Sequence, residues 1–187
     1  MVQPLPEGYV FDPADPRAPT HAQWAAMSEP DRARVVDMLP TSLPVELAPP
    51  PEGDVHRKVK ERAMSALGDF LRRAGRKIYL SSELIVLYPG ERAFVPDLLA
   101  VLDVGHPAAR PRAGGDVDPH DRVRWVVDAE GKGLDLVLEV HVAGDRTKDE
   151  KTNVERYARL GIREYFLFDR ARMSLQGHRL AAGGRTY

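Results

Sequence analysis

The chain contains no cysteine, which excludes disulfide bonds, thiolate zinc sites and a cysteine nucleophile. No apolar run approaches the roughly 20 residues that a membrane-spanning helix needs. The N-terminal residues lack the basic and apolar segments of a secretory signal, so we expect a cytoplasmic protein. A strong charge of one sign is also absent. Because the formal net charge is −1, a nucleic-acid partner would have to meet a local basic patch.

What is present suffices for one well-buried domain and an extension: 187 residues, of which 43% are hydrophobic and 29% charged. Residues 1–19 are rich in proline and show no period, so we interpret them as a flexible arm. Residues 20–53 are predicted to form a helical extension and a proline-rich linker, because Thr20 and Gln23 have the spacing of a capping box. Residues 54–187 form the predicted main domain.

The main domain alternates helical and strand-like patterns, which indicates an α/β (α+β) fold. Pro89-Gly90 is expected to be the turn of a hairpin between its first two strands. Residues 105–133 are rich in Gly, Pro, Asp and Arg, and we interpret them as a loop insertion. The predicted elements are a helix at 54–74, strands at 78–88, 94–104 and 134–142, a helix at 149–160, and strands at 164–168 and 175–180.

Two acidic residues interrupt apolar segments of this domain. Glu139 is the only formal charge in the run Leu136–Val142, and Asp97 lies near the start of another apolar run. Burying a carboxylate costs several kcal/mol unless it is paired or holds a cation. A shared divalent metal is the simplest explanation, and two carboxylates suit Mg²⁺ or Mn²⁺. The alternative for Glu139 is a carboxylate satisfied by an arginine or a backbone amide.

Two further residues are candidates for the same site. Strand side chains alternate between faces, so Glu139 and His141 are predicted to point the same way. His141 is either a functional base or a hydrogen-bonded packing residue. Glu83 is predicted to lie in the middle of the strand at 78–88, where it is either a third metal ligand or a solvated edge residue.

Three segments of the chain are distinctive: Val95-Pro96-Asp97-Leu98, Leu136-Val137-Leu138-Glu139-Val140 and the stretch from Tyr157 to Asp169. Together they resemble the Uma-type putative restriction endonuclease family of the PD-(D/E)XK nuclease superfamily. The resemblance implies a restriction-endonuclease-like mixed β-sheet flanked by helices and metal-dependent hydrolysis of phosphodiester bonds. It also implies that Asp97 and Glu139 are the metal ligands.

The position of the catalytic lysine differs from the pattern of that family. His141 stands where the superfamily signature has a lysine two residues after the acid. Asn153 aligns with a lysine that many members carry in the following helix, while Lys151 lies about half a turn away and Lys148 lies earlier. A lysine there orients the attacking water and stabilises negative charge, and His141 is able to act as a general base near neutral pH. We therefore include His141 and Lys151 among the catalytic candidates.

These observations lead to three functional hypotheses. The first is a Mg²⁺- or Mn²⁺-dependent DNA endonuclease that acts as a homodimer, since an open sheet edge and a proline-rich arm leave surface to cover. The second is a nuclease-like protein that has lost catalysis and serves as a homodimeric binding or structural module, which the missing lysine favours. The third is a metal hydrolase acting on a small phosphoester, which would need a closed pocket.

Overall fold

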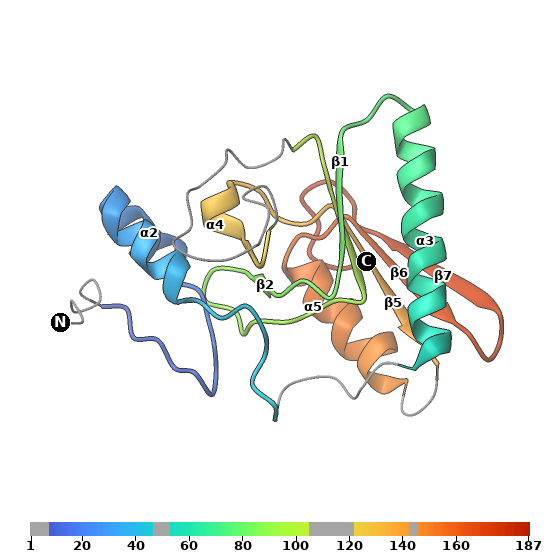
Figure 1. The fold of residues 1–187 in the computed structure, drawn as a ribbon, viewed down its shortest axis with the longest axis horizontal. Coiled ribbons are helices and arrows are strands. Elements are labelled where there is room, and N and C mark those ends of the chain that lie inside the picture. Colours follow the sequence, from blue (N-terminus) through green and yellow to red (C-terminus); the bar gives the residue numbers. More distant parts are fainter. Residues whose placement is uncertain (1–7, 47–52, 105–121, 143–145) are drawn as a thin grey trace. The chain divides into compact units, whose positions relative to one another are not determined.

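The computed structural model describes residues 8–46, 53–104, 122–142 and 146–187 (Figure 1). The polypeptide forms two compact units, each built from three segments of the chain. The first unit consists of Met1–Pro49, Leu84–Val95 and Val123–Gly133, and the second consists of Pro50–Glu83, Pro96–Arg122 and Leu134–Tyr187.

The first unit is a small assembly of helices around a parallel strand pair. Its elements are α1 (His21–Ala26), α2 (Glu29–Met38), β2 (Val86–Leu87), β4 (Trp125–Val126) and α4 (Val127–Glu130). Strands β2 and β4 pair through Val86 with Trp125 and Leu87 with Val126. Its core contains Tyr9, Ala18, Met27, Val35, Leu39, Ile85, Leu87, Ala93 and Val126.

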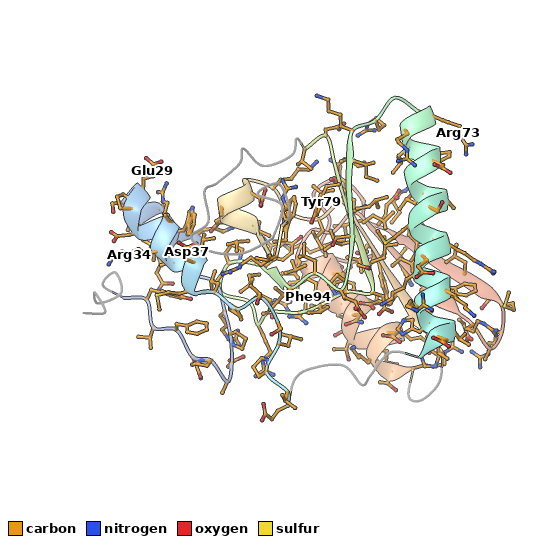
Figure 2. The ribbon with its side chains drawn as sticks, in the orientation of Figure 1. Glu29, Arg34, Asp37, Arg73, Tyr79 and Phe94 are labelled. Atoms are coloured by element: carbon orange, nitrogen blue, oxygen red, sulfur yellow. The ribbon has the colours of Figure 1, made fainter. Side chains whose placement is uncertain are left out.

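Local sequence signals explain where the helices of the first unit begin. The capping box predicted from Thr20 and Gln23 is confirmed, since Thr20 Oγ1 accepts from the Gln23 backbone N–H at 3.3 Å and Gln23 Oε1 accepts from that of Thr20 at 2.9 Å. Helix α2 is amphipathic in its packing, with Glu29 and Asp37 exposed (Figure 2) and Val35 fully buried. This burial attaches α2 to the core of the first unit.

Two segments without sequence periodicity contribute to that core, which corrects their interpretation as an arm and a loop. Tyr9 and Ala18 are only 7% and 5% exposed, and the Tyr9 hydroxyl donates to the Arg17 carbonyl at 2.8 Å. Residues 123–133 contain β4 and α4. An extended, proline-rich segment can bury single side chains without any helical or strand period, so its sequence carries no signal of burial. Residues 1–7 and 105–121 of the predicted arm and insertion lie outside the described residues.

The second unit contains a five-stranded mixed sheet with helices packed on it, as expected from the sequence. Its elements are α3 (Asp54–Arg73), β1 (Ile78–Ser82), β3 (Leu98–Leu102), β5 (Leu136–His141), the π-helical turn η1 (Lys148–Thr152), α5 (Asn153–Arg159), β6 (Glu164–Asp169) and β7 (Ser174–Arg179). The strand order is β1-β3-β5-β6-β7, with β5 and β6 parallel and every other neighbouring pair antiparallel. Helix α3 packs against β1 and β5 (Figure 1).

The strand predicted at 78–88 is two strands in different units. Strand β1 ends at Ser82, and the next residue, Glu83, adopts a left-handed conformation with φ of 55° that a continuous strand cannot contain. Leu84–Val95 then belongs to the first unit before the chain returns for β3. The predicted antiparallel pairing of these two segments is confirmed, since β1 pairs with β3. The connection between β1 and β3, however, is longer than the predicted hairpin turn. The physical cause is burial of Ile85 and Leu87 in the core of the first unit.

The register of the sheet brings three acidic positions to one end of neighbouring strands. Ser82 pairs with Leu98, and Leu98 pairs with Leu138, in antiparallel register. The residues one step further along these segments are Glu83, Asp97 and Glu139. None of the helices in the described ranges is long and apolar enough to cross a membrane.

Candidate functional site

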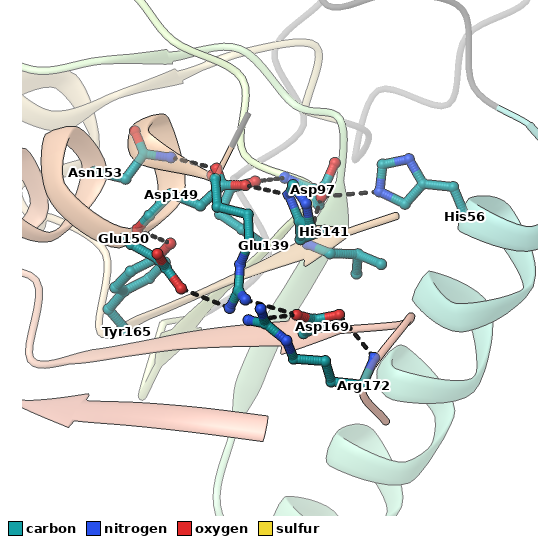
Figure 3. A network of polar contacts seen from close by, with 12 residues as sticks. His56, Asp97, Glu139, His141, Asp149, Glu150, Asn153, Tyr165, Asp169 and Arg172 are labelled. Atoms are coloured by element: carbon teal, nitrogen blue, oxygen red, sulfur yellow. Dashed lines mark hydrogen bonds and ion pairs between the residues drawn. The ribbon is translucent and has the colours of Figure 1, made fainter. Parts of the chain in front are cut away.

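Asp97 and Glu139 are held together by reciprocal hydrogen bonds from the backbone. The Val140 N–H donates to Asp97 Oδ2 at 2.7 Å, and the Asp97 N–H donates to Glu139 Oε2 at 3.3 Å. Figure 3 shows both residues in the polar network of the site. Glu139 is 7% exposed, whereas the side chain of Asp97 retains 19% exposure. Each carboxylate is thus positioned by the strand segment that carries the other, so both occupy the same end of the sheet.

The electrostatic environment of Glu139 disfavours its ionised form. Burial and, secondly, the negative charge of Asp97 raise the pKa of Glu139 to about 8, and Asp149 adds to this effect. A hydrogen bond from the Tyr157 hydroxyl at 2.5 Å and the positive charge of Lys148 act in the opposite direction. The carboxyl group is therefore largely protonated at neutral pH unless a further positive charge lies beside it.

His141 lies on β5 two residues after Glu139 and is fixed by the π-helical turn. Its Nδ1 lies 3.3 Å from Asp149 Oδ2, and only 8% of the residue is exposed. Asn153 Nδ2 donates to Asp149 Oδ1 at 3.2 Å, and the Tyr165 hydroxyl donates to the Asp149 carbonyl at 2.9 Å (Figure 3). A π-helical turn is uncommon and occurs often at functional sites. Here it directs the Asp149 carboxylate toward His141.

The segment that carries Asp149 is anchored to the neighbouring strand by a buried ion pair. Arg146 Nη1 lies 3.1 Å from Asp169 Oδ2, and Asp169 is 2% exposed at the end of β6. Asp169 pairs with His141 in the parallel register of β5 and β6. This anchor links the turn preceding α5 to the strand beside His141, which restricts the position of Asp149.

Two residues that the sequence pattern did not identify contact the paired acids. His56 Nε2, in the first turn of α3, lies 2.9 Å from Asp97 Oδ2. The hydroxyl of Tyr157 on α5 contacts Glu139, as described above. Both side chains come from helices, and a helical periodicity shows which face is apolar without showing which distant strand a polar residue meets. For Tyr157, the sequence offers one signal, because this tyrosine opens the segment 157–169 that resembles the family.

The structure does not bring Glu83 together with the two acids as a ligand set. Its carboxylate lies 2.7 Å from Lys60 Nζ, and its side chain is 53% exposed. Within the described ranges, no group of three or more His, Cys, Asp or Glu residues could hold a metal ion. The candidate lysines Lys148 and Lys151 are exposed in the π-helical turn, although the charge of Lys148 acts on Glu139.

The donor set of Asp97 and Glu139 fits a small divalent cation. Mg²⁺ binds through one or two carboxylates together with water and substrate phosphates, and therefore does not need a third protein ligand. Ionisation of the buried Glu139 carboxyl beside Asp97 is unfavourable, and a cation between the two groups would offset this cost. The two acids would thus hold Mg²⁺ or Mn²⁺ at the end of the sheet.

The mixed sheet and its flanking helices define a nuclease-like α+β fold. A family model, Uma2, described as "Putative restriction endonuclease", matches residues 45–187, which is more than half of the chain. The chain belongs to this family. A solved structure with the same fold is that of a putative nuclease belonging to DUF820 from Anabaena variabilis ATCC 29413, with 17% sequence identity and a TM-score of 0.51. The match covers 70% of this chain and 65% of that protein, which is less than two thirds of its length. No curated protein matches the chain.

Proposed function

We propose that the protein is a divalent-metal-dependent DNA endonuclease that hydrolyses phosphodiester bonds. The observation that carries the proposal is the reciprocal backbone support of Asp97 and Glu139, which holds two carboxylates together at a partly exposed end of the sheet. Membership of the restriction endonuclease family supports the choice of DNA as substrate. Asp97 and Glu139 would be the ligands of Mg²⁺ or Mn²⁺, and Glu83 is a third ligand only if it leaves Lys60.

The residues around the paired acids have separate roles in this proposal. Mg²⁺ or Mn²⁺ at the site would polarise the phosphate and promote formation of hydroxide from water. His141 would accept a proton from the attacking water at Nε2, because Asp149 engages Nδ1 and orients the ring. His56 restrains the Asp97 carboxylate from the α3 side. Tyr157 restrains Glu139 through its hydroxyl.

A catalytically impaired binding or structural module is the second candidate function. It is favoured by the replacement of the signature lysine with His141 and by the exposure of Lys148 and Lys151. We propose that the protein forms a homodimer, whether it acts as an endonuclease or as a binding or structural module. Sedimentation over micromolar concentrations tests this assembly, and a monomer throughout that range would contradict it.

The deciding experiment combines metal binding with plasmid nicking. Mn²⁺ is titrated calorimetrically into the wild type, Glu139→Ala and the control Glu155→Gln, whose side chain is exposed on α5. The same proteins are then incubated with supercoiled plasmid in Mg²⁺ or Mn²⁺, with and without a chelator. We expect cleavage by the wild type and the control, and a loss of both metal binding and cleavage in Glu139→Ala.

Two other outcomes would redirect the functional assignment. Metal binding and DNA binding by a wild type that cleaves no form of DNA would support the second candidate instead. Hydrolysis of a small phosphodiester such as bis(p-nitrophenyl) phosphate, without plasmid cleavage, would support the small-phosphoester hydrolase.

A further inference from the structure

Helix α3 carries a buried lysine, Lys60, near the candidate site, and the proposed mechanism does not use it. Of the lysines in the described ranges, Lys60 alone is buried, with 3% of the residue exposed. Full burial of a lysine is rare because desolvation of the ammonium group is costly. A buried lysine at this position therefore requires an explanation.

Lys60 faces the same end of the sheet as the paired acids. It lies four residues after His56, and residues with this spacing share one face of a helix. His56 contacts Asp97 at 2.9 Å, and Lys60 contacts Glu83 at 2.7 Å. Since Ser82 pairs with Leu98, the residues that follow and precede them, Glu83 and Asp97, are neighbours across β1 and β3. The two contacts of α3 therefore reach adjacent positions of the sheet end.

The partner of Lys60 is placed by an unfavourable backbone conformation. Glu83 has φ of 55°, a left-handed conformation that is unfavourable for a non-glycine residue and is found preferentially at functional sites. The side chain of Glu83 is 53% exposed while that of Lys60 is 4% exposed. The side chain of Glu83 is thus open to solvent, whereas that of Lys60 is enclosed by protein.

We propose that Lys60 supplies the catalytic lysine from helix α3, contacting the phosphate of the DNA that is cleaved, and that Glu83 occupies its anion position when DNA is absent. The inference rests on the proposed nuclease function. On binding, a phosphate oxygen replaces the Glu83 carboxylate beside the Lys60 ammonium group, so one anion is exchanged for another. The positive charge then stabilises the negative charge that develops on the phosphate during hydrolysis.

Other roles for this ion pair predict different results. A purely structural pair requires both partners for stability and predicts no specific effect on DNA affinity. A metal-ligand role for Glu83 predicts that its neutralisation weakens Mn²⁺ binding. The exchange proposed here predicts effects of opposite sign, because removal of Lys60 weakens DNA binding and removal of the competing Glu83 charge strengthens it.

The experiment is a double-mutant cycle on the full chain with Lys60→Gln, Glu83→Gln and the double variant. Lys58→Gln is the matched control, because Lys58 is an exposed lysine on the same helix. DNA affinity is measured on a short duplex in Ca²⁺ at several salt concentrations, and single-turnover plasmid cleavage is measured in Mn²⁺. Calorimetric Mn²⁺ titration and thermal unfolding are recorded for each variant. Lys60→Arg is added as the conservative change, which retains the charge if Lys60→Gln does not fold.

We expect Lys60→Gln to lower the cleavage rate by about a hundredfold and to reduce the slope of log affinity against log salt by about one, as for the loss of one phosphate contact. Lys60→Arg should retain the salt slope. Glu83→Gln should bind DNA about threefold more tightly than the wild type. This gain in affinity should vanish when Lys60→Gln is also present, because Glu83 then has no Lys60 ammonium group to occupy. If Glu83 merely repelled the DNA, the gain would be the same with and without Lys60→Gln. Lys58→Gln should cleave like the wild type.

Three results would overturn the proposal for Lys60: an unchanged salt slope and cleavage rate in Lys60→Gln, the same gain from Glu83→Gln in both backgrounds, or weaker Mn²⁺ binding in Glu83→Gln. Any of these with an active wild type leaves the nuclease function standing. A wild type that binds DNA without cleaving it, while Lys60→Gln loses the phosphate contact, would contradict the nuclease function and the catalytic role of Lys60, and would leave Lys60 as a phosphate-binding residue. A wild type that binds no DNA would contradict both.

Discussion

The two units of this chain bury different kinds of side chain. In the first unit the buried residues are apolar, as in the core around Val35, Leu39 and Leu87. The second unit also has apolar strands, but it contains all the buried charged or polar residues of the described ranges. These are Lys60, Glu139, His141, Asn153 and Asp169.

The difference separates the contribution of each unit to stability and to chemistry. Burial of apolar surface is favourable without any partner, so the core of the first unit is stabilised without a buried charged group. Burial of charged groups is favourable only with well-placed partners. The second unit provides such partners for His141 and Asp169, but it places Glu139 beside Asp97, a second carboxylate. Placing Glu139 beside Asp97 lowers the stability of the folded protein, and such a pair is expected where the two carboxylates bind a ligand.

The largest expected effect is a loss of stability in the first unit. Leu39 is 2% exposed, and Leu39→Ala removes buried surface and leaves a cavity, which should lower the free energy of unfolding by about 3 kcal/mol. Urea denaturation measures the change. Mn²⁺ affinity and the nicking rate per folded molecule should remain those of the wild type. A specific loss of metal binding in the folded variant would contradict the division of roles between the units.

The next effect concerns catalysis in the second unit. His141→Ala should lower the cleavage rate about a hundredfold, as expected for loss of a positioned general base, while Mn²⁺ affinity changes little. Asp149→Asn should cause a smaller loss of the same kind, because it removes the charge that orients the ring. Single-turnover plasmid cleavage and calorimetry provide the two readouts. If His141→Ala cleaves at the wild-type rate, Lys148 and Lys151 become the better candidates beside Lys60.

A third prediction uses the raised pKa of Glu139. Between its ordinary value of 4.5 and about 8 the folded state keeps a proton that the unfolded state has released, so stability should fall as pH rises through this window. One pKa unit corresponds to about 1.4 kcal/mol, so the metal-free protein should lose a few kcal/mol of stability across this window. Glu139→Gln should remove this slope and be the more stable protein at pH 8. Denaturation curves at several pH values test this, and an equal slope in both proteins would refute the assignment.

The smallest effect is expected at Tyr157. Burial and the charge of Glu139 hold the pKa of Tyr157 well above its usual range, so its hydroxyl remains a donor throughout the pH window. Tyr157→Phe removes this donor and should lower the free energy of unfolding by about 1 kcal/mol. Mn²⁺ affinity should fall less than about threefold. A complete loss of metal binding would show that the tyrosine has a larger part in the site than the positioning of Glu139.

Much of the second unit could be predicted from the sequence because its signals are local. Apolar runs predict the strands β3, β5 and β6. The single charges of Asp97 and Glu139 within or beside such runs predict a shared site. The break at Glu83 was not predictable in this way. The apolar pattern continues through residues 78–88, and it does not show that Ile85 and Leu87 are buried in another core.

The amino-acid sequence by itself determined the α+β class, the family resemblance and the two acidic residues at its centre, because strand periodicity and the cost of a buried charge act within a few residues. Tertiary structure alone decided which groups meet those acids. His56 reaches Asp97 from helix α3 and Tyr157 reaches Glu139 from helix α5. Lys60 is buried only because α3 packs on the sheet at that point. Contacts of this kind depend on the packing of whole elements, which no local pattern encodes.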